Sequence, residues 1–301
     1  MAITQGSQSE LSYVLETGYG VTPAEPQLKV INKASYDLNL TKATIENTNI
    51  RGDRQKYAPQ HGNFSATGNI AAPLNFREYD DFFAGALCNT WINNVLKNGV
   101  TKQFATVVGT QKDIGAHRIA RGMFVNQMAL TAAQGANVEV TFDLIGKSLE
   151  ATTTALDGTV TPPVSADNLI RSGYGSLTED GVALADVTNF TLTVANNASL
   201  SHTLFTNESK DLSTDAITVT GEVTLYWNDI TQFQKFINGT RTALNVVIGD
   251  GTNTYTISLP NVTYTANNAP VNAQGNLTVA IPFEATVDNV AGYTIQITRS
   301  A

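Results

Sequence analysis

The sequence contains a single cysteine, Cys88, among 301 residues. One cysteine excludes an internal disulfide and a metal cage built of several cysteines, and it favours folding in a reducing cytoplasm. No stretch approaches the roughly 18 uninterrupted apolar residues of a membrane-spanning helix. Residues 1–10 are polar and lack the basic start and apolar run of a secretory signal, so we expect no export by that route.

Basic residues are also scarce. The chain has 18 lysines and arginines against 26 aspartates and glutamates, which gives a net charge of −8. A duplex phosphate backbone would on average be repelled, which disfavours a protein that reads DNA sequence. The composition is otherwise that of a folded protein with a surface rich in Thr, Asn, Gln and Ser, and the length suits two domains of about 150 residues.

Residues that carry catalysis or bind metals are few and scattered. The histidines His61, His117 and His202 lie far apart and form no HExxH motif, and no G-x-S-x-G elbow marks a nucleophile. Only Trp91 and Trp227 are available to line a sugar-binding cleft, and each adjoins a predicted helix whose packing it can serve. The sequence therefore predicts no catalytic residue, no cofactor and no metal site.

What the sequence has in abundance is β-strand pattern. Apolar residues alternate with polar ones over residues 36–40, 190–194 and 277–283, which indicates strands with one buried and one wet face. Asp250-Gly251 separates two further apolar runs and predicts a tight hairpin. Antiparallel pairing follows from such connections.

Two short segments show helical spacing instead. Tyr79, Phe82, Phe83, Ala86 and Leu87 form one apolar stripe, and Ile230, Phe233, Phe236 and Ile237 form a second. The residues at the ends of these segments suit helix termini. The first begins with acidic residues, and the second has Asn228 and Asp229 as candidate caps and ends at Gly239.

These two series repeat each other along the chain. Each half runs in the order strands, helix, strands. The matching segments are residues 36–40 and 190–194, Thr67-Gly68-Asn69-Ile70 and Thr220-Gly221-Glu222-Val223, the two helices, and residues 135–142 and 275–281.

The repeat predicts a mainly β protein with two tandem antiparallel β-sandwich or barrel lobes, each with one flanking α-helix. We expect an N-terminal arm at 1–33, a first lobe at 34–150, an interlobe linker at 151–186 and a second lobe at 187–301. The linker is rich in Thr, Pro and Gly, and Thr161-Pro162-Pro163 breaks any regular element.

Such sandwiches leave strand edges with unpaired N–H and C=O groups, and this sequence does little to blunt them. Lateral pairing with another copy is therefore expected, and a heterologous contact of this kind closes a ring or grows a helix. Three chains would present six similar lobes around one axis. We favour this trimer, with six chains per ring as the alternative.

Residues 11–23 read LSYVLETGYGVTP, which resembles the N-terminal signature of siphophage major tail (tail tube) proteins. The resemblance extends through residues 45–55, Gly68-Asn69-Ile70 and the aromatic helix at 79–87. It implies sandwich lobes whose inner strands join into one barrel around a lumen, in a tube that holds the tape-measure protein and later conducts DNA. It also implies a virion protein that is synthesised in the host bacterial cytoplasm.

The same resemblance implies a long loop between early strands that reaches the adjacent ring. Its candidate is the cluster Arg51, Asp53, Arg54 and Lys56. The alternatives are a solvated loop that makes no contact and, for Arg51-Gly52-Asp53, a cell-adhesion tripeptide. Tyr19 and Pro23 of the arm are further candidates for contacts between subunits. Acidic candidates for the lumen surface are Asp37, Glu139 and Glu222.

Two functions of other classes remain open at this stage. One is a carbohydrate-binding or adhesive β-sandwich on a virion or cell surface, and the other is a polysaccharide-degrading enzyme of the tail tip. Both require an exposed aromatic or acidic cleft.

Overall fold

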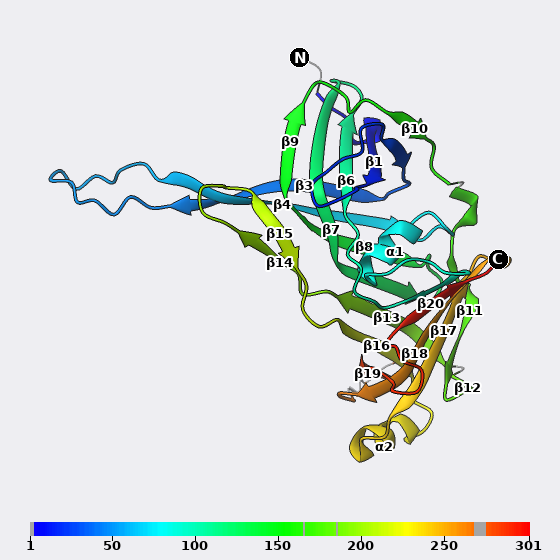
Figure 1. Ribbon diagram of the computed structural model, residues 1–301. Coiled ribbons are helices and arrows are strands. Elements are labelled where there is room, and N and C mark those ends of the chain that lie inside the picture. Colours follow the sequence, from blue (N-terminus) through cyan, green and yellow to red (C-terminus); the bar gives the residue numbers. More distant parts are fainter. Residues whose placement is uncertain (1–2, 165, 185, 268–274) are drawn as a thin grey trace.

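The computed structural model describes residues 3–164, 166–184, 186–267 and 275–301, and most of them form β-strands. Two sandwich lobes lie one after the other, and a long hairpin projects from the first (Figure 1). The α-helices among the described residues are α1, Asp80–Ala86, and α2, Thr231–Asn238. The mainly β fold with two short helices is confirmed.

One antiparallel sheet runs through both lobes, and we call it the shared sheet. Its strands pair in the order β3 (Ser35–Ile45), β4 (Gln60–Pro73), β8 (Glu139–Gly146), β7 (Ala116–Ala133), β13 (Val187–Ala195), β16 (Thr218–Tyr226), β19 (Thr278–Ala285) and β18 (Thr254–Tyr264). The join between the lobes is the pairing of β7 with β13, from Asn189 opposite Ala133 to Ala195 opposite Gln127.

Alternation in the sequence decides which face of this sheet is buried. Phe190, Leu192 and Val194 of β13 point into the core, and the threonines between them point away. Most of the buried apolar residues of both lobes form one continuous cluster. The predicted strands at 36–40, 190–194 and 277–283 are thus confirmed, with β19 starting at Thr278.

A second sheet covers the core of each lobe, and we call it the outer sheet of that lobe. In the first lobe it contains β2 (Gln27–Val30), β1 (Ser9–Leu15), β6 (Ala105–Gln111), the first half of β7 and β9 (Ser148–Thr152), with β10 (Thr159–Thr161) added parallel to β2. In the second lobe it contains β12 (Val182–Ala183), β11 (Arg171–Glu179), β17 (Thr242–Gly249), β18, β20 (Gln296–Arg299) and β5 (Val95–Lys97).

The strand β7 bends from the outer sheet into the shared sheet, and the bend falls at Gly122. This glycine has a φ of 69°, which L side chains rarely adopt. A Cβ there would also lie 2.8 Å from the Cβ of Lys147. Glycine is therefore required for one strand to serve both sheets of the lobe.

The internal repeat is confirmed at the level of strand register. Residues matched by sequence alone lie opposite equivalent partners in the two lobes. The equivalent pairs are Leu38 with Gly68 and Leu192 with Gly221, and then Ile70 with Phe142 and Val223 with Ile281.

The glycine of each repeat faces the core and leaves room for a large neighbour. A Cβ on Gly221 would lie 2.3 Å from the carbonyl oxygen of Thr191 and 2.5 Å from Cζ of Phe283. The Phe283 ring uses this space and stacks on Phe190 at 6.2 Å between centroids.

Of the terminal and turn signals of the second lobe, Gly239 and Asp250-Gly251 are confirmed, whereas the N-cap of α2 is Ile230, with no side-chain cap, and is neither Asn228 nor Asp229. The side chain of Asp229 accepts a hydrogen bond at 2.8 Å from the N–H of Thr231, the first residue of α2. Gly239 ends the helix in the left-handed conformation with φ of 60°. The hairpin between β17 and β18 turns at Asp250-Gly251, where Asp250 accepts from the N–H groups of Thr252 and Asn253.

The division of the chain at residues 33, 150 and 186 stays a prediction. The segment 1–33 includes β1 and β2, and β1 pairs with β6 over residues 9–15. It thus contributes two strands to the first lobe. The segment 151–186 includes β10, which ends at Thr161 before the two prolines, and β11, which pairs with β17 of the second lobe.

Candidate assembly interface

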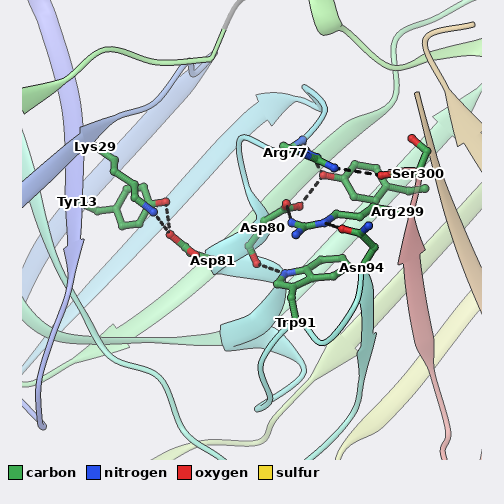
Figure 2. A network of polar contacts seen from close by, with 10 residues as sticks. Tyr13, Lys29, Arg77, Asp80, Asp81, Trp91, Asn94, Arg299 and Ser300 are labelled. Carbon is green, nitrogen blue, oxygen red and sulfur yellow. Dashed lines mark hydrogen bonds and ion pairs between the residues drawn. The ribbon is translucent and has the colours of Figure 1, made fainter. Parts of the chain in front are cut away.

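A polar network connects the two lobes (Figure 2). Its centre is Asp80, the first residue of α1, whose carboxylate accepts hydrogen bonds from Tyr255 of β18 at 2.6 Å and from Arg299 of β20. The Trp91 indole N–H donates to the Asp80 backbone carbonyl at 2.9 Å, and the Arg299 guanidinium lies 4.5 Å from the Trp91 ring centroid. Arg299 also donates to Asn94 at 2.9 Å. Three segments far apart in the chain thus meet at one carboxylate.

The electrostatics of this network follow from its burial. Burial raises the pKa of Asp80, although the hydrogen bond from Tyr255 and the charge of Arg299 oppose the shift. Burial and the adjacent Asp80 raise the pKa of Tyr255, so its hydroxyl stays a donor. The neighbouring Asp81 accepts from Tyr13 at 2.9 Å and pairs with Lys29 at 2.6 Å, which ties α1 to β1 and β2 as well.

The acidic candidates Asp37, Glu139 and Glu222 lie on one face of the shared sheet. Asp37 stands opposite Asn69, and Asn69 stands opposite Asp143. Because side chains alternate along each strand, Glu139 shares the face of Asp143. The pairing continues through β7 and β13 to Glu222. This face is the polar one, opposite the core.

No lysine or arginine offsets these carboxylates in the central part of the shared sheet. The strands β4, β8, β13, β16 and β19 contain no lysine or arginine, and neither do residues 124–133 of β7, the part that pairs with β8 and β13. The two arginines of β7, Arg118 and Arg121, lie in its first half, which pairs with β6 and β9. Glu284 of β19 adds a further carboxylate, since its neighbour across the ladder, Thr220, lies on the face of Glu222. The result is a broad, polar, acidic surface that spans both lobes.

The β3–β4 hairpin projects far from the first lobe (Figure 1). Every residue from 41 to 61 is exposed, and Arg51, Asp53, Arg54 and Lys56 lie at its tip. Arg51 donates to both carboxylate oxygens of Asp53, at 3.0 and 2.7 Å, and this hydrogen bonding lowers the pKa of Asp53. The guanidinium also lies 4.9 Å from the Tyr57 ring centroid. The tip is therefore charged and free of contact with the core.

A second hairpin, which the sequence patterns did not reveal, lies beside the first. It consists of β14 (Ser199–His202) and β15 (Ser209–Ser213) and occupies the place in the second lobe that the projecting hairpin occupies in the first. The N–H of Phe64 in β4 donates to the carbonyl of Asn207 at 3.0 Å. Leu204 and Phe205 at its tip are exposed. The repeat was the signal that could have predicted this hairpin. It connects β13 to β16, as the projecting hairpin connects the equivalent strands β3 and β4.

The other two candidates for subunit contacts lie apart from the charged tip. Tyr19 and Pro23 fall in the segment between β1 and β2 and are half-buried. The Tyr19 hydroxyl lies 2.5 Å from that of Ser209 in β15, and its ring packs 5.0 Å from that of Phe104. Tyr19 thus supports the second hairpin from within the same chain.

The described residues offer little for catalysis. They contain no group of three or more His, Cys, Asp or Glu side chains that could hold a metal ion. Burial raises the pKa of the Cys88 thiol to about 11, so little thiolate forms at neutral pH. Among the helices of this part of the chain, none is long and apolar enough to cross a membrane.

Comparison with protein families identifies the chain. A family model described as phage tail tube protein matches residues 6–285. A search of curated proteins gave no match. The matched region includes the first lobe, the projecting hairpin, Asp80 and most of the second lobe, and it ends before β20 with Arg299. The match spans most of the chain, and the chain therefore belongs to the phage tail tube protein family.

Proposed function

We propose that three copies of this chain form a ring, and that stacked rings form the tube of a phage tail. The tube surrounds the tape-measure protein and later conducts DNA, and the subunit catalyses no reaction. The observation that carries the proposal is the shared sheet, which passes from lobe to lobe through the pairing of β7 with β13. One chain thus already contains the kind of lobe-to-lobe joint that a ring needs.

Ring closure requires the ends of the shared sheet to be open. Within the described residues, β3 pairs with β4 alone, so its other edge presents unpaired backbone groups. The opposite end of the sheet is the last part of β18: Tyr255–Ser258 lie between β17 and β20, whereas within the described residues Thr263 and Tyr264 pair with β19 alone. Pairing the β3 edge of one copy with the free edge that begins at Thr263 of the next makes a heterologous contact, which three two-lobed chains close into a pseudo-sixfold ring. Six chains per ring remain the alternative.

The acidic face of the sheet suits the wall of a DNA channel. When the sheet closes, the polar face with Asp37, Glu139 and Glu222 forms the inner surface and the apolar face stays in the sandwich cores. An acidic wall repels phosphate and so keeps DNA from adhering during passage. The same face offers threonine and asparagine hydroxyls and amides to the tape-measure protein.

The projecting hairpin suits the contact between rings. Its exposed tip carries cations and one carboxylate, and it extends well beyond the lobe that bears it (Figure 1). We assign Arg51, Asp53, Arg54 and Lys56 to pairing with polar groups of the adjacent ring. Exposed ion pairs are individually weak, about 0–1 kcal/mol each, so stacking depends on many copies acting together.

Shortening the hairpin tests this assignment. Ile45 lies opposite Gln60, so an Asn-Gly turn can replace residues 46–59 without disturbing the strands. We expect the shortened variant to keep the thermal stability of the wild type and to form rings, but to fail to form long tubes in negative-stain images. Long tubes from the shortened variant would contradict the role of the hairpin. A wild-type protein that stays monomeric at high concentration would contradict the tube itself.

A further inference from the structure

The two helices occupy equivalent places in their lobes but differ in exposure. Tyr79 precedes α1 and Ile230 precedes α2, with nearly the same backbone angles. In this alignment four apolar residues of the first lobe correspond to four of the second. The pairs are Phe76 with Trp227, Tyr79 with Ile230, Phe82 with Phe233, and Ala86 with Ile237.

The members of the first set are at most 4% exposed, whereas those of the second set are 41–63% exposed. The helix α2 packs on its own lobe through Phe236 and the buried Gln232. Trp227, Ile230, Phe233 and Ile237 are left as an outward apolar stripe, which we call the α2 stripe. Contiguous exposed apolar groups of this kind mark interaction surfaces.

The cover over α1 comes from both lobes. Phe82 packs on Tyr13 and Phe142 of its own lobe, at 4.7 and 5.2 Å between ring centroids, whereas Phe76 is covered by the following lobe. Tyr255 of the second lobe packs 5.1 Å from the ring of Phe76 and 5.6 Å from that of Phe83. Its hydroxyl and the Arg299 guanidinium bind Asp80 at the start of the helix. The helix α1 lies between the lobes, while α2 lies at the end of the molecule away from the first lobe (Figure 1). The lobe that would cover α2 in the same way must belong to another copy.

Strand register identifies the equivalent surface on that copy. Tyr255 follows the β17–β18 turn and stands opposite Ile248, as His117 follows the β6–β7 turn and stands opposite Thr110. Arg299 pairs with Tyr255 as Thr152 pairs with His117. The surface therefore lies on the outer sheet of the first lobe, at the start of β7 and along β9. Figure 1 shows β9 at the end of the molecule opposite α2.

We propose that the α2 stripe docks on the outer sheet of the first lobe of the next copy, around His117 and Thr152. This contact repeats outside the chain the contact of α1 with the second lobe inside it. It rests on the proposed ring, and it supplies that ring with an apolar contact in addition to the strand pairing at β3.

Two variants test the contact by assembly. F233S/I237S removes apolar groups that are exposed in the single chain, so circular dichroism and the melting temperature of the monomer are expected to stay unchanged. The concentration needed to form rings is expected to rise at least tenfold. The matched control, L204S/F205S, alters an exposed apolar pair on the β14–β15 hairpin and is expected to form rings at the wild-type concentration. Equal effects of the two variants, or no effect of F233S/I237S, would overturn the proposal.

Photo-crosslinking locates the contact without weakening it. A photoreactive phenylalanine analogue at position 227, the equivalent of Phe76, is expected to crosslink, in otherwise unchanged tubes, to residues 116–121 or 148–152 of another copy. Crosslinks confined to other segments would overturn the docking surface while leaving the tube intact. Failure of the unsubstituted protein to form any ring would instead overturn the proposed function.

Discussion

Replacing Arg299 by methionine is expected to destabilise the protein by about 2–3 kcal/mol. The substitution leaves the Asp80 carboxylate, whose side chain is 11% exposed, with Tyr255 as its remaining hydrogen-bond donor. Removing one partner of a buried ion pair costs about 3–5 kcal/mol, and the 20% exposure of the Arg299 side chain places this pair below that range. The methionine keeps most of the apolar contact with Trp91, so the loss is mainly electrostatic.

The pH dependence of this loss separates the electrostatic account from lost packing. Burial already raises the pKa of Asp80, and loss of the Arg299 charge raises it further. A carboxyl whose folded pKa lies above the unfolded value destabilises the fold once it is ionised. The cost of Arg299→Met is therefore expected to be larger at pH 8 than at pH 5, because protonation of the buried Asp80 relieves the unpaired charge as the pH falls.

Urea unfolding at both pH values measures these effects. The double variant D80N/R299M removes both charges and is expected to recover about 1 kcal/mol or more at pH 8 relative to R299M. R121M is the matched control, because Arg121 pairs with the 54% exposed Glu150 and its loss is expected to cost less than about 1 kcal/mol. A cost for R299M within about 0.5 kcal/mol of zero, or one that does not change with pH, would refute the reasoning.

Three further predictions address the core, the pH dependence and the lumen. Gly221→Ala is expected to cost about 1–3 kcal/mol in urea unfolding, because its Cβ would meet Thr191 and Phe283, whereas Gly173→Ala, with nothing within 4 Å, should change stability by less than about 0.5 kcal/mol. Burial would raise the pKa of Asp180, but hydrogen bonds from Thr242, Ala243 and Lys235 outweigh it and lower the pKa from 3.8 to about 2. This half-exposed group therefore stabilises the fold above pH 4, and its contribution is lost as the pH falls toward 2. Asp180→Asn should remove this part of the fall in unfolding free energy, which amounts to less than about 1 kcal/mol. An unchanged fall between pH 4 and pH 2 would contradict this assignment. The variant D37K/E139K/E222K, which changes the net charge from −8 to −2 by adding six positive units, is expected to form tubes that bind DNA with strong salt dependence in a filter assay. Equal DNA binding by tubes of E25K/D157K/D215K, altered at exposed sites off this face, would contradict the lumen assignment.

Local pattern was enough to predict several strands of the shared sheet, the two helices and the repeat that relates them, but not the strands in residues 1–33 and 151–186. Alternation at Phe190, Leu192 and Val194 predicts a half-buried strand because such a strand has two faces of different polarity, and the structure has it in β13. The matched segments Thr67-Gly68-Asn69-Ile70 and Thr220-Gly221-Glu222-Val223 predict equivalent strands, and in the structure each glycine lies opposite a leucine of the neighbouring strand. These features depend on near neighbours in sequence, which a reader of the sequence can see.

Contacts between distant segments could not be read in the same way. Asp80 and Arg299 are separated by most of the chain. The sequence around Asp80 indicates only an acidic residue at the start of a helix, and the sequence around Arg299 indicates no partner. The β14–β15 hairpin is short and mostly exposed, so its sequence shows little apolar periodicity. The pairing of β1 with β6 likewise depends on which edge is open in the folded lobe.

A cryo-electron microscopy reconstruction of the assembled protein tests the central claim most directly. We expect a hollow tube with three copies per ring, in which the β3 edge of each copy pairs with the shared sheet of the next and Asp37, Glu139 and Glu222 face the channel. An assembly whose channel is lined by any other face of the lobes, or in which the β3 edge meets only solvent, would contradict it.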